Sequence, residues 1–142
     1  MFFGNYQHAL DNKGRLVIPS KMRDEAGDLL YIMKGYEGCL SVFKQSAFQN
    51  EIQKINALPF NQKNARDYIR MQLSSVVELE VDKQGRIQLP TQLLSDYSIG
   101  KSVVVVGVVD HFEIWDANAW AQYLKDNEGS YETKAEVLPI IK

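Results

Sequence analysis

Two arginines in this chain each follow an aspartate by four residues, and a glycine stands directly before each arginine. They are Arg15 after Asp11 and Arg86 after Asp82. A carboxylate at this spacing can hold a guanidinium group in a fixed orientation. An arginine aimed in this way offers two parallel N–H donors, which suit the two acceptors on the major-groove edge of guanine. The alternative is a turn aspartate with a purely structural ion pair. Both interpretations can hold together, because a structural aspartate can position a functional arginine.

Five further basic residues lie close to these pairs in the sequence. They could contact nucleic-acid phosphates and so position the two arginines, or they could be solvated surface charges. The chain has 16 basic and 18 acidic residues, a net charge of −2, whereas phosphate binding usually shows as a basic excess. Nucleic-acid binding would therefore depend on where the cations lie, or on several subunits adding weak contacts. The five residues are Lys13, Lys21, Arg23, Lys83 and Lys101.

The two Asp–Arg segments belong to an internal repeat. Residues 10–19 match residues 81–90 at an offset of 71, and Asp, Gly, Arg and Pro coincide. The match resumes downstream at an offset of 72, where Gly35 aligns with Gly107. Chance does not readily produce two such stretches in register, so the sequence indicates one unit written twice.

Each unit predicts the same order of elements. Polar and apolar residues alternate in a first strand, most clearly over residues 77–81. The Asp-x-x-Gly segment is typical of a turn. A second strand follows, with Leu16 and Ile18 or Ile87 and Leu89 expected to face inward. It ends at Pro19 or Pro90, since proline cannot donate to a β-ladder. Ser20 or Thr91 is expected to cap a short helix. Two more strands follow in each unit, over residues 30–33 and 40–43 and over residues 102–106 and 112–115.

Helical segments are predicted between and after the units. Apolar residues recur at helical spacing over residues 48–55 and again over residues 65–73, and Pro59 separates the two helices. Trp120, Tyr123 and Leu124 predict one more helix, and residues 127–130 read as a loop. We expect the tail to be mobile or partner-dependent. The expected division is a first unit over 1–48, a helical connector over 49–74, a second unit over 75–120, and a C-terminal helix and tail over 121–142.

Other kinds of site find little support. The single cysteine, Cys39, excludes an internal disulfide and favours a reducing compartment. The N-terminal segment does not resemble a signal peptide, and the longest apolar run, residues 103–109, is far too short to span a membrane. The only histidines, His8 and His111, occupy different places in the two units, so we expect neither a metal site nor a Cys/His catalytic pair. The sequence predicts a cytoplasmic protein without cofactor or enzymatic activity.

The repeated segments resemble the MraZ family of bacterial transcriptional regulators, which is related to the AbrB-like swapped-hairpin proteins. The resemblance covers roughly residues 1–125. It implies a mainly β fold with short helices (α+β), made of two tandem swapped-hairpin units of SpoVT-AbrB type related by a pseudo-twofold axis. The two copies of the motif differ in charge at one position, because Lys13 of the first copy aligns with Gln84 of the second. The motifs are Asp11-x-Lys13-Gly14-Arg15-x-x-x-Pro19, Asp82-x-x-Gly85-Arg86-x-x-x-Pro90 and the lead-in Met1-Phe2-x-Gly4.

The resemblance also implies a function. It implies a ring-like homo-oligomer, associated with the nucleoid, that binds direct repeats in the promoter of its own division and cell-wall operon. A link to the neighbouring rRNA methyltransferase is implied as well. The implied DNA contacts fall on Arg15 and Arg86, with Asp11 and Asp82 beside them. The alternatives from the residues alone are a protein–protein interaction or scaffold module of the same fold that does not bind DNA, and an enzyme subunit.

Overall fold

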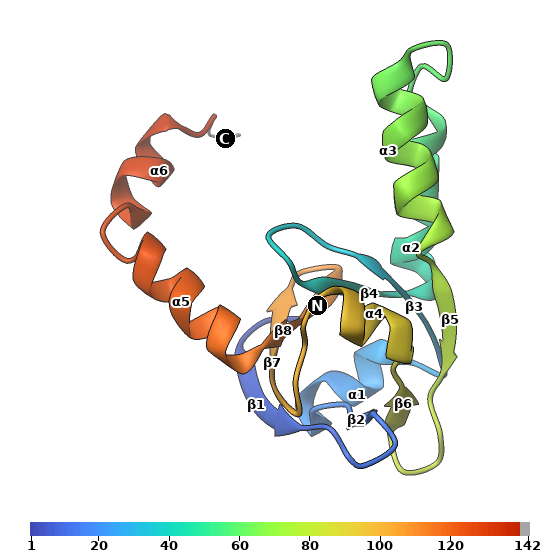
Figure 1. Cartoon of the computed structure of the whole chain (residues 1–142), viewed down its shortest axis with the longest axis vertical. Helices are drawn as coiled ribbons and strands as arrows, with labels where there is room; N and C mark the ends of the chain where they lie inside the picture. Colours follow the sequence, from blue (N-terminus) through green and yellow to red (C-terminus); the bar gives the residue numbers. More distant parts are fainter. Residues whose placement is uncertain (140–142) are drawn as a thin grey trace.

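The central feature of the fold is a six-stranded antiparallel sheet with the strand order β1-β7-β8-β4-β3-β5 (Figure 1). A computed structural model describes residues 1–139. A separate ribbon of two antiparallel strands, β2 and β6, lies beside the sheet. The strands are β1 (Asn5–Ala9), β2 (Arg15–Val17), β3 (Leu29–Lys34), β4 (Leu40–Lys44), β5 (Val77–Glu80), β6 (Arg86–Gln88), β7 (Ser102–Val108) and β8 (His111–Asp116).

The two halves of the chain are interleaved in this sheet. The first strand of each half pairs with the third strand of the other half, β1 with β7 and β5 with β3. The fourth strands β4 and β8 pair with each other, and so do the second strands β2 and β6. The strand order is therefore symmetric about the β4–β8 pair. The predicted α+β fold of two swapped-hairpin units related by a pseudo-twofold axis is confirmed.

The strand register corrects the predicted alignment of the repeat. Lys34 pairs with Leu40 in the first half, whereas Gly107 pairs with Phe112 in the second. The third strands therefore match at an offset of 73, and the alignment of Gly35 with Gly107 is wrong by one residue. The second half has two more residues before its third strand and one fewer in the following turn. Loops accept such changes more easily than strands do.

Two short helices, α1 (Ser20–Ala26) and α4 (Thr91–Asp96), follow the ribbon strands. Their N-cap residues are Pro19 and Pro90, and neither helix has a side-chain cap hydrogen bond. The prediction that Ser20 or Thr91 caps these helices is therefore wrong. Each proline keeps an extended backbone directly before its helix, and the helix begins at the next residue. Ser20 and Thr91 therefore already lie in the first helical turn.

Longer helices form two projections from the sheet (Figure 1). The helices α2 (Gln45–Asn56) and α3 (Lys63–Ser74) make a hairpin, which confirms the two helices predicted on either side of Pro59. After β8, α5 (Ala117–Asn127) forms as predicted, but a further helix, α6 (Tyr131–Val137), follows where only a tail was expected. Residues 140–142 of that predicted tail lie outside the described residues.

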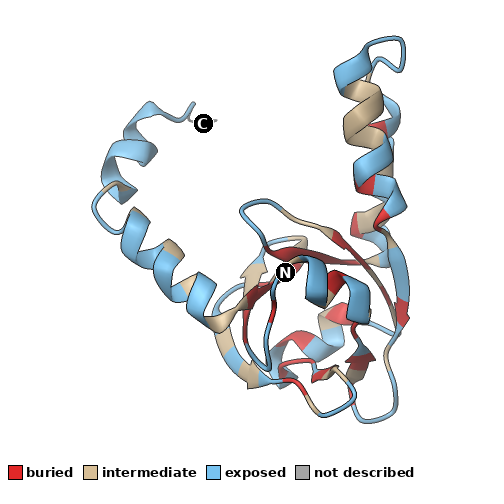
Figure 2. Ribbon diagram, viewed as in Figure 1, coloured by how far each residue is buried: buried red, intermediate tan, exposed pale blue. Residues whose placement is uncertain are grey.

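The main core lies between one face of the sheet and the layer formed by the ribbon, α1 and α4 (Figure 2). Leu16 and Ile87 face each other at the centre of the ribbon and are almost completely buried. Ile18 and Leu89 are buried as well, so the predicted inward-facing positions are confirmed. This packing fixes which face of the ribbon points outward.

Candidate nucleic-acid interface

The first Asp–Arg pair is built into a tight turn between β1 and β2. Asp11 Oδ1 accepts hydrogen bonds from the backbone N–H groups of Lys13 at 2.9 Å and Arg15 at 2.8 Å. Asp11 Oδ2 accepts a third from Arg15 Nε at 2.6 Å. The carboxylate thus folds the turn with one oxygen and holds the arginine side chain with the other. Gly14 takes a positive φ of 76°, which glycine adopts without strain.

The second pair repeats this arrangement between β5 and β6. Asp82 Oδ1 accepts from the backbone N–H groups of Gln84 and Arg86, both at 2.9 Å, and Asp82 Oδ2 accepts from Arg86 Nε at 2.8 Å. Gly85 has a φ of 74°. The Asp-x-x-Gly turn and the Asp–Arg ion pair, both read from the sequence, are therefore present twice with the same atoms.

The two carboxylates are held in their charged form. The backbone N–H of Arg15, followed by its side chain, lowers the pKa of Asp11 despite partial desolvation. The backbone N–H and side chain of Arg86 lower the pKa of Asp82 in the same way. Each arginine therefore has a fully ionised partner at neutral pH.

Both arginines lie on the outer face of the β2–β6 ribbon. Arg15 pairs across the ribbon with Gln88, and Arg86 with Val17, so the arginines are diagonal neighbours. Their side chains are 29% and 27% exposed, while Leu16 and Ile87 between them point into the core. Among residues 1–139, the hydrogen bonds of both guanidinium groups use Nε alone. The two Nη groups of each arginine therefore stay available for another partner.

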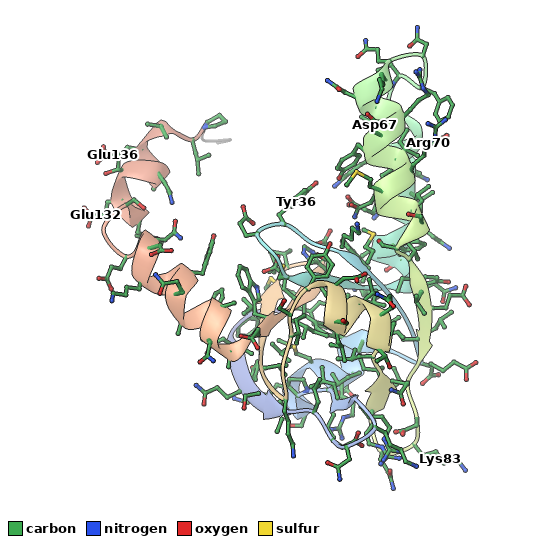
Figure 3. All side chains as sticks on the ribbon, in the orientation of Figure 1. Tyr36, Asp67, Arg70, Lys83, Glu132 and Glu136 are labelled. Carbon is green, nitrogen blue, oxygen red and sulfur yellow. The ribbon has the colours of Figure 1, made fainter. Side chains whose placement is uncertain are left out.

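Of the four lysines predicted as flanking contacts, two lie in these turns and two lie elsewhere. Lys13 and Lys83 are in the two Asp-x-x-Gly turns, and Figure 3 shows Lys83 at the end of the molecule opposite the projecting helices. Lys21 is exposed in the first turn of α1. Lys101 precedes β7, and its carbonyl accepts the backbone N–H of Leu10 at 2.8 Å.

Arg23 differs from the other cations because it is bound to the protein itself. Arg23 Nη2 donates to the carbonyl of Ile18 at 3.0 Å. Its guanidinium also covers Gly85, where an added Cβ would lie 2.7 Å from Arg23 Cζ. Arg23 of α1 therefore packs over the second Asp–Arg turn while its guanidinium is hydrogen-bonded to Ile18. The sequence contains no signal for this contact, because the two residues are far apart in the chain.

One polar residue of the outer face was missed in the sequence. Gln88 Nε2 donates to the carbonyl of Lys13 at 2.6 Å and so ties the second half to the first turn. Its outward position in the alternation of the second strand could have indicated it. Within the described residues, no group of three or more His, Cys, Asp or Glu side chains is placed to hold a metal ion. No helix in that part of the chain is long and apolar enough to cross a membrane.

These features define a two-unit swapped-hairpin protein with a pair of carboxylate-held arginines on one β-ribbon. The chain belongs to the MraZ family, described as "MraZ protein, putative antitoxin-like", which matches residues 1–71 and 73–138. It is 41% identical over 138 residues to a protein of Caldanaerobacter subterraneus subsp. tengcongensis named transcriptional regulator MraZ, covering 97% of this chain and 96% of the relative. The proteins of that name from Desulforamulus reducens (42% over 136 residues, covering 96% of each chain) and Kocuria rhizophila (41% over 140 residues, covering 98% of each chain) are similarly related.

Proposed function

We propose that this chain is a sequence-specific DNA-binding transcriptional regulator that reads base edges with Arg15 and Arg86. The observation that carries the proposal is their placement on one outward ribbon face, where Asp11 and Asp82 hold each Nε and leave the Nη groups available. The relatives named as transcriptional regulators support the same class of function.

A two-stranded ribbon suits the shape of DNA. The major groove of B-DNA, roughly 12 Å wide, admits a β-ribbon, and arginine can bond guanine O6 and N7 together. In this proposal Lys13 and Lys83 in the turns, and Lys21 on α1, contact phosphates and set the register. Arg23 already donates from Nη2 to the carbonyl of Ile18, so a phosphate would be contacted by its remaining N–H groups.

The proposal extends to the arrangement of several copies. A net charge of −2 gives one chain little electrostatic affinity for DNA, so several linked copies on spaced boxes would supply it. We propose a ring-like homo-oligomer in the cytoplasm, associated with the nucleoid, that binds direct repeats in the promoter of its own division and cell-wall operon. Functional contact with the neighbouring rRNA methyltransferase belongs to the same proposal, as does the absence of enzymatic activity.

The test compares binding to the protein's own upstream promoter with binding to a shuffled fragment by fluorescence anisotropy. Arg15→Lys and Arg86→Lys keep the charge but lose the two-donor fork. Each should weaken promoter binding by about 1–3 kcal/mol per lost contact, roughly 5- to 150-fold, and leave binding to the shuffled fragment nearly unchanged. Lys83→Ala should weaken both and flatten the salt dependence. Equal wild-type affinity for the two fragments would overturn the proposal.

A protein–protein module without DNA binding is the second candidate function. Large apolar side chains exposed on the projections favour it, among them Phe60 in the turn between α2 and α3, Met71 on α3 and Leu124 on α5. It predicts no binding to the promoter fragment at any salt concentration, and the same titration therefore separates the two functions.

A further inference from the structure

A polar cavity of about 330 Å³ lies on the face of the sheet opposite the main core. Leu40 and Val42 of β4 point into the main core, so the alternating residues Ser41 and Phe43 point to the other face. Strands β3, β4 and β8 supply the floor of the cavity, and α2 and α3 supply one side. Small-molecule sites occupy roughly 300–1,000 Å³. The cavity therefore has room for a small molecule.

Ser41 and Glu113 lie at the centre of the floor, where the two halves of the chain meet. They pair directly across β4 and β8, and they are equivalent residues of the repeat at an offset of 72. The pseudo-twofold axis therefore passes between them. The first half places a hydroxyl group at this point, whereas the second half places a carboxylate.

The Glu113 carboxylate is held in place by one oxygen. Its Oε1 accepts a hydrogen bond from Trp115 Nε1 at 3.0 Å, and within residues 1–139 no N–H or O–H group donates to Oε2. Burial, followed by the charge of Glu113, raises the pKa of the neighbouring Cys39 thiol, so the thiol stays protonated. A thiol is only a weak donor. Glu113 Oε2 therefore remains a strong acceptor at the floor of the cavity.

Two almost completely buried polar side chains open into the same cavity. Ser41 is 7% exposed and Gln72 of α3 is 9% exposed. Gln72 Nε2 donates to the carbonyl of Lys34 at 3.0 Å, which leaves its Oε1 as an acceptor. Within residues 1–139 neither Ser41 Oγ nor Gln72 Oε1 has a hydrogen-bond partner, and no side-chain N or O atom there is both sealed and unbonded. Both oxygens are therefore reachable from the cavity, and such buried groups normally have a partner.

The charges around the cavity favour a cation. Carboxylates outnumber lysines among the lining residues by three to two. Lys54 Nζ lies 3.8 Å from Glu51 Oε2, and Lys34 Nζ forms no hydrogen bond within residues 1–139 that would satisfy the acceptors at the floor. A primary ammonium group carries three N–H donors. It therefore matches the three oxygens of Ser41, Gln72 and Glu113 in number and in charge.

The wall beside these oxygens is apolar and aromatic. Met33, Phe43 and Val108 contribute to it. The Phe43 ring stacks on the His111 ring with centroids 4.5 Å apart, and His111 Nδ1 lies 2.7 Å from Asp110 Oδ1. Methylene groups can pack against such a wall, and an aromatic face also attracts a cation. An acceptor-lined floor next to an apolar wall suits a short alkyl chain with an ammonium head.

From these observations we propose that the cavity binds a small aliphatic primary amine in its ammonium form. Its N–H groups bond Ser41 Oγ, Gln72 Oε1 and Glu113 Oε2, and its alkyl chain packs on Phe43. The Arg15 and Arg86 ribbon lies on the other side of the sheet, beyond the main core. The inference therefore depends neither on DNA reading nor on self-association.

Isothermal titration calorimetry of the full-length chain with 1-aminobutane as the probe tests the site. The titration should be saturable with one site per chain. Butyltrimethylammonium keeps the charge but has no N–H donor, and butanoate keeps the chain but reverses the charge. Both should bind at least about tenfold more weakly, because hydrogen bonds to charged groups are lost. Absence of binding by 1-aminobutane, or equal binding of all three probes, would overturn the proposal.

Three variants assign the contacts. Glu113→Gln keeps the bond to Trp115 through Oε1 but removes the charge, and it should weaken binding of 1-aminobutane by about tenfold or more. Ser41→Ala should also weaken binding, without lowering the melting temperature, because the hydroxyl has no partner within residues 1–139. The matched control Glu80→Gln removes the same charge from an exposed strand residue outside the cavity and should bind like the wild type. Wild-type affinity in Glu113→Gln and Ser41→Ala would refute this site.

Discussion

Asp11 and Asp82 each serve two purposes with one carboxylate. In both turns Oδ1 accepts two backbone N–H groups and Oδ2 accepts the arginine Nε. A carboxylate that folds the turn and orients the guanidinium couples the backbone conformation to the direction of the arginine. The structural and functional interpretations of the motif are therefore compatible at the level of single atoms.

This dual role predicts the effect of Asp11→Asn and Asp82→Asn. An amide that keeps the turn bonds through its oxygen places an NH2 group opposite Arg Nε, so the guanidinium loses its fixed orientation. The ratio of promoter affinity to random-DNA affinity should fall, while random-DNA affinity should rise slightly because a negative charge is lost. Anisotropy titrations on the two DNA fragments measure the ratio. Asp28→Asn removes one exposed acid elsewhere and should leave the ratio intact; an unchanged ratio in the turn variants would refute orientation by the carboxylates.

At the scale of elements, the second turn depends on a contact with α1 that the first turn lacks. Gly14→Ala and Gly85→Ala both place a Cβ at positive φ, which costs about 1–2 kcal/mol. Only Gly85→Ala also displaces Arg23 from its bond to Ile18, an added loss of roughly 0.5–1.5 kcal/mol. Urea unfolding should therefore show the larger loss for Gly85→Ala. The difference should vanish when both substitutions are made in an Arg23→Ala background, and its persistence there would contradict this explanation.

Helix α1 is also fastened to β4 by an ion pair, which predicts a pH dependence. Lys44 Nζ donates to Glu25 Oε1 at 2.6 Å and the Met1 ammonium donates at 2.7 Å, and these bonds lower the Glu25 pKa from 4.5 to about 2. A folded-state pKa below the unfolded value stabilises the fold above about pH 4.5, and this contribution is lost as the pH falls towards 2. In Glu25→Gln the melting temperature should depend less on pH between 4.5 and 2. The exposed substitution Glu37→Gln should follow the wild type, and parallel curves for Glu25→Gln would refute the prediction.

On the scale of the whole molecule, every strand pairing except the two hairpins β3–β4 and β7–β8 joins the two halves. Leu16 and Ile87 meet at the centre of one such pairing and are buried. The halves should therefore unfold together in one cooperative transition.

Leu16→Ala tests this cooperativity, because both tryptophans, Trp115 and Trp120, lie in the second half. Loss of the buried Leu16 side chain should cost about 2–5 kcal/mol. The urea transition followed by tryptophan fluorescence should shift as far as the one followed by circular dichroism. The exposed substitution Val17→Ala on the same strand should shift both far less. A fluorescence transition that stays in place would show that the halves unfold independently.

The sequence by itself determined the features that depend on neighbouring residues. The Asp-x-x-Gly-Arg turns, the inward residues Leu16 and Ile87, and the helices on either side of Pro59 follow from turn chemistry and periodicity, which act over a few positions. The repeat could also be recognised in the sequence, because both copies keep the same residue types. Because the two turns carry the same motif, the repeat was the reason to treat them as one site.

Only the tertiary structure decided which distant segments meet. The exchange of first strands between halves, the offset of 73 in the third strands and the cover of Gly85 by Arg23 each depend on contacts between residues far apart in the chain. The proline N-caps were missed for a local reason, since Pro19 and Pro90 keep an extended backbone up to the first helical residue. Helix α6 was missed as well, and it has no buried residue. Local patterns fix which residues form a strand or a turn, whereas burial of a common core selects their partners, and that selection places Arg15 and Arg86 on one face.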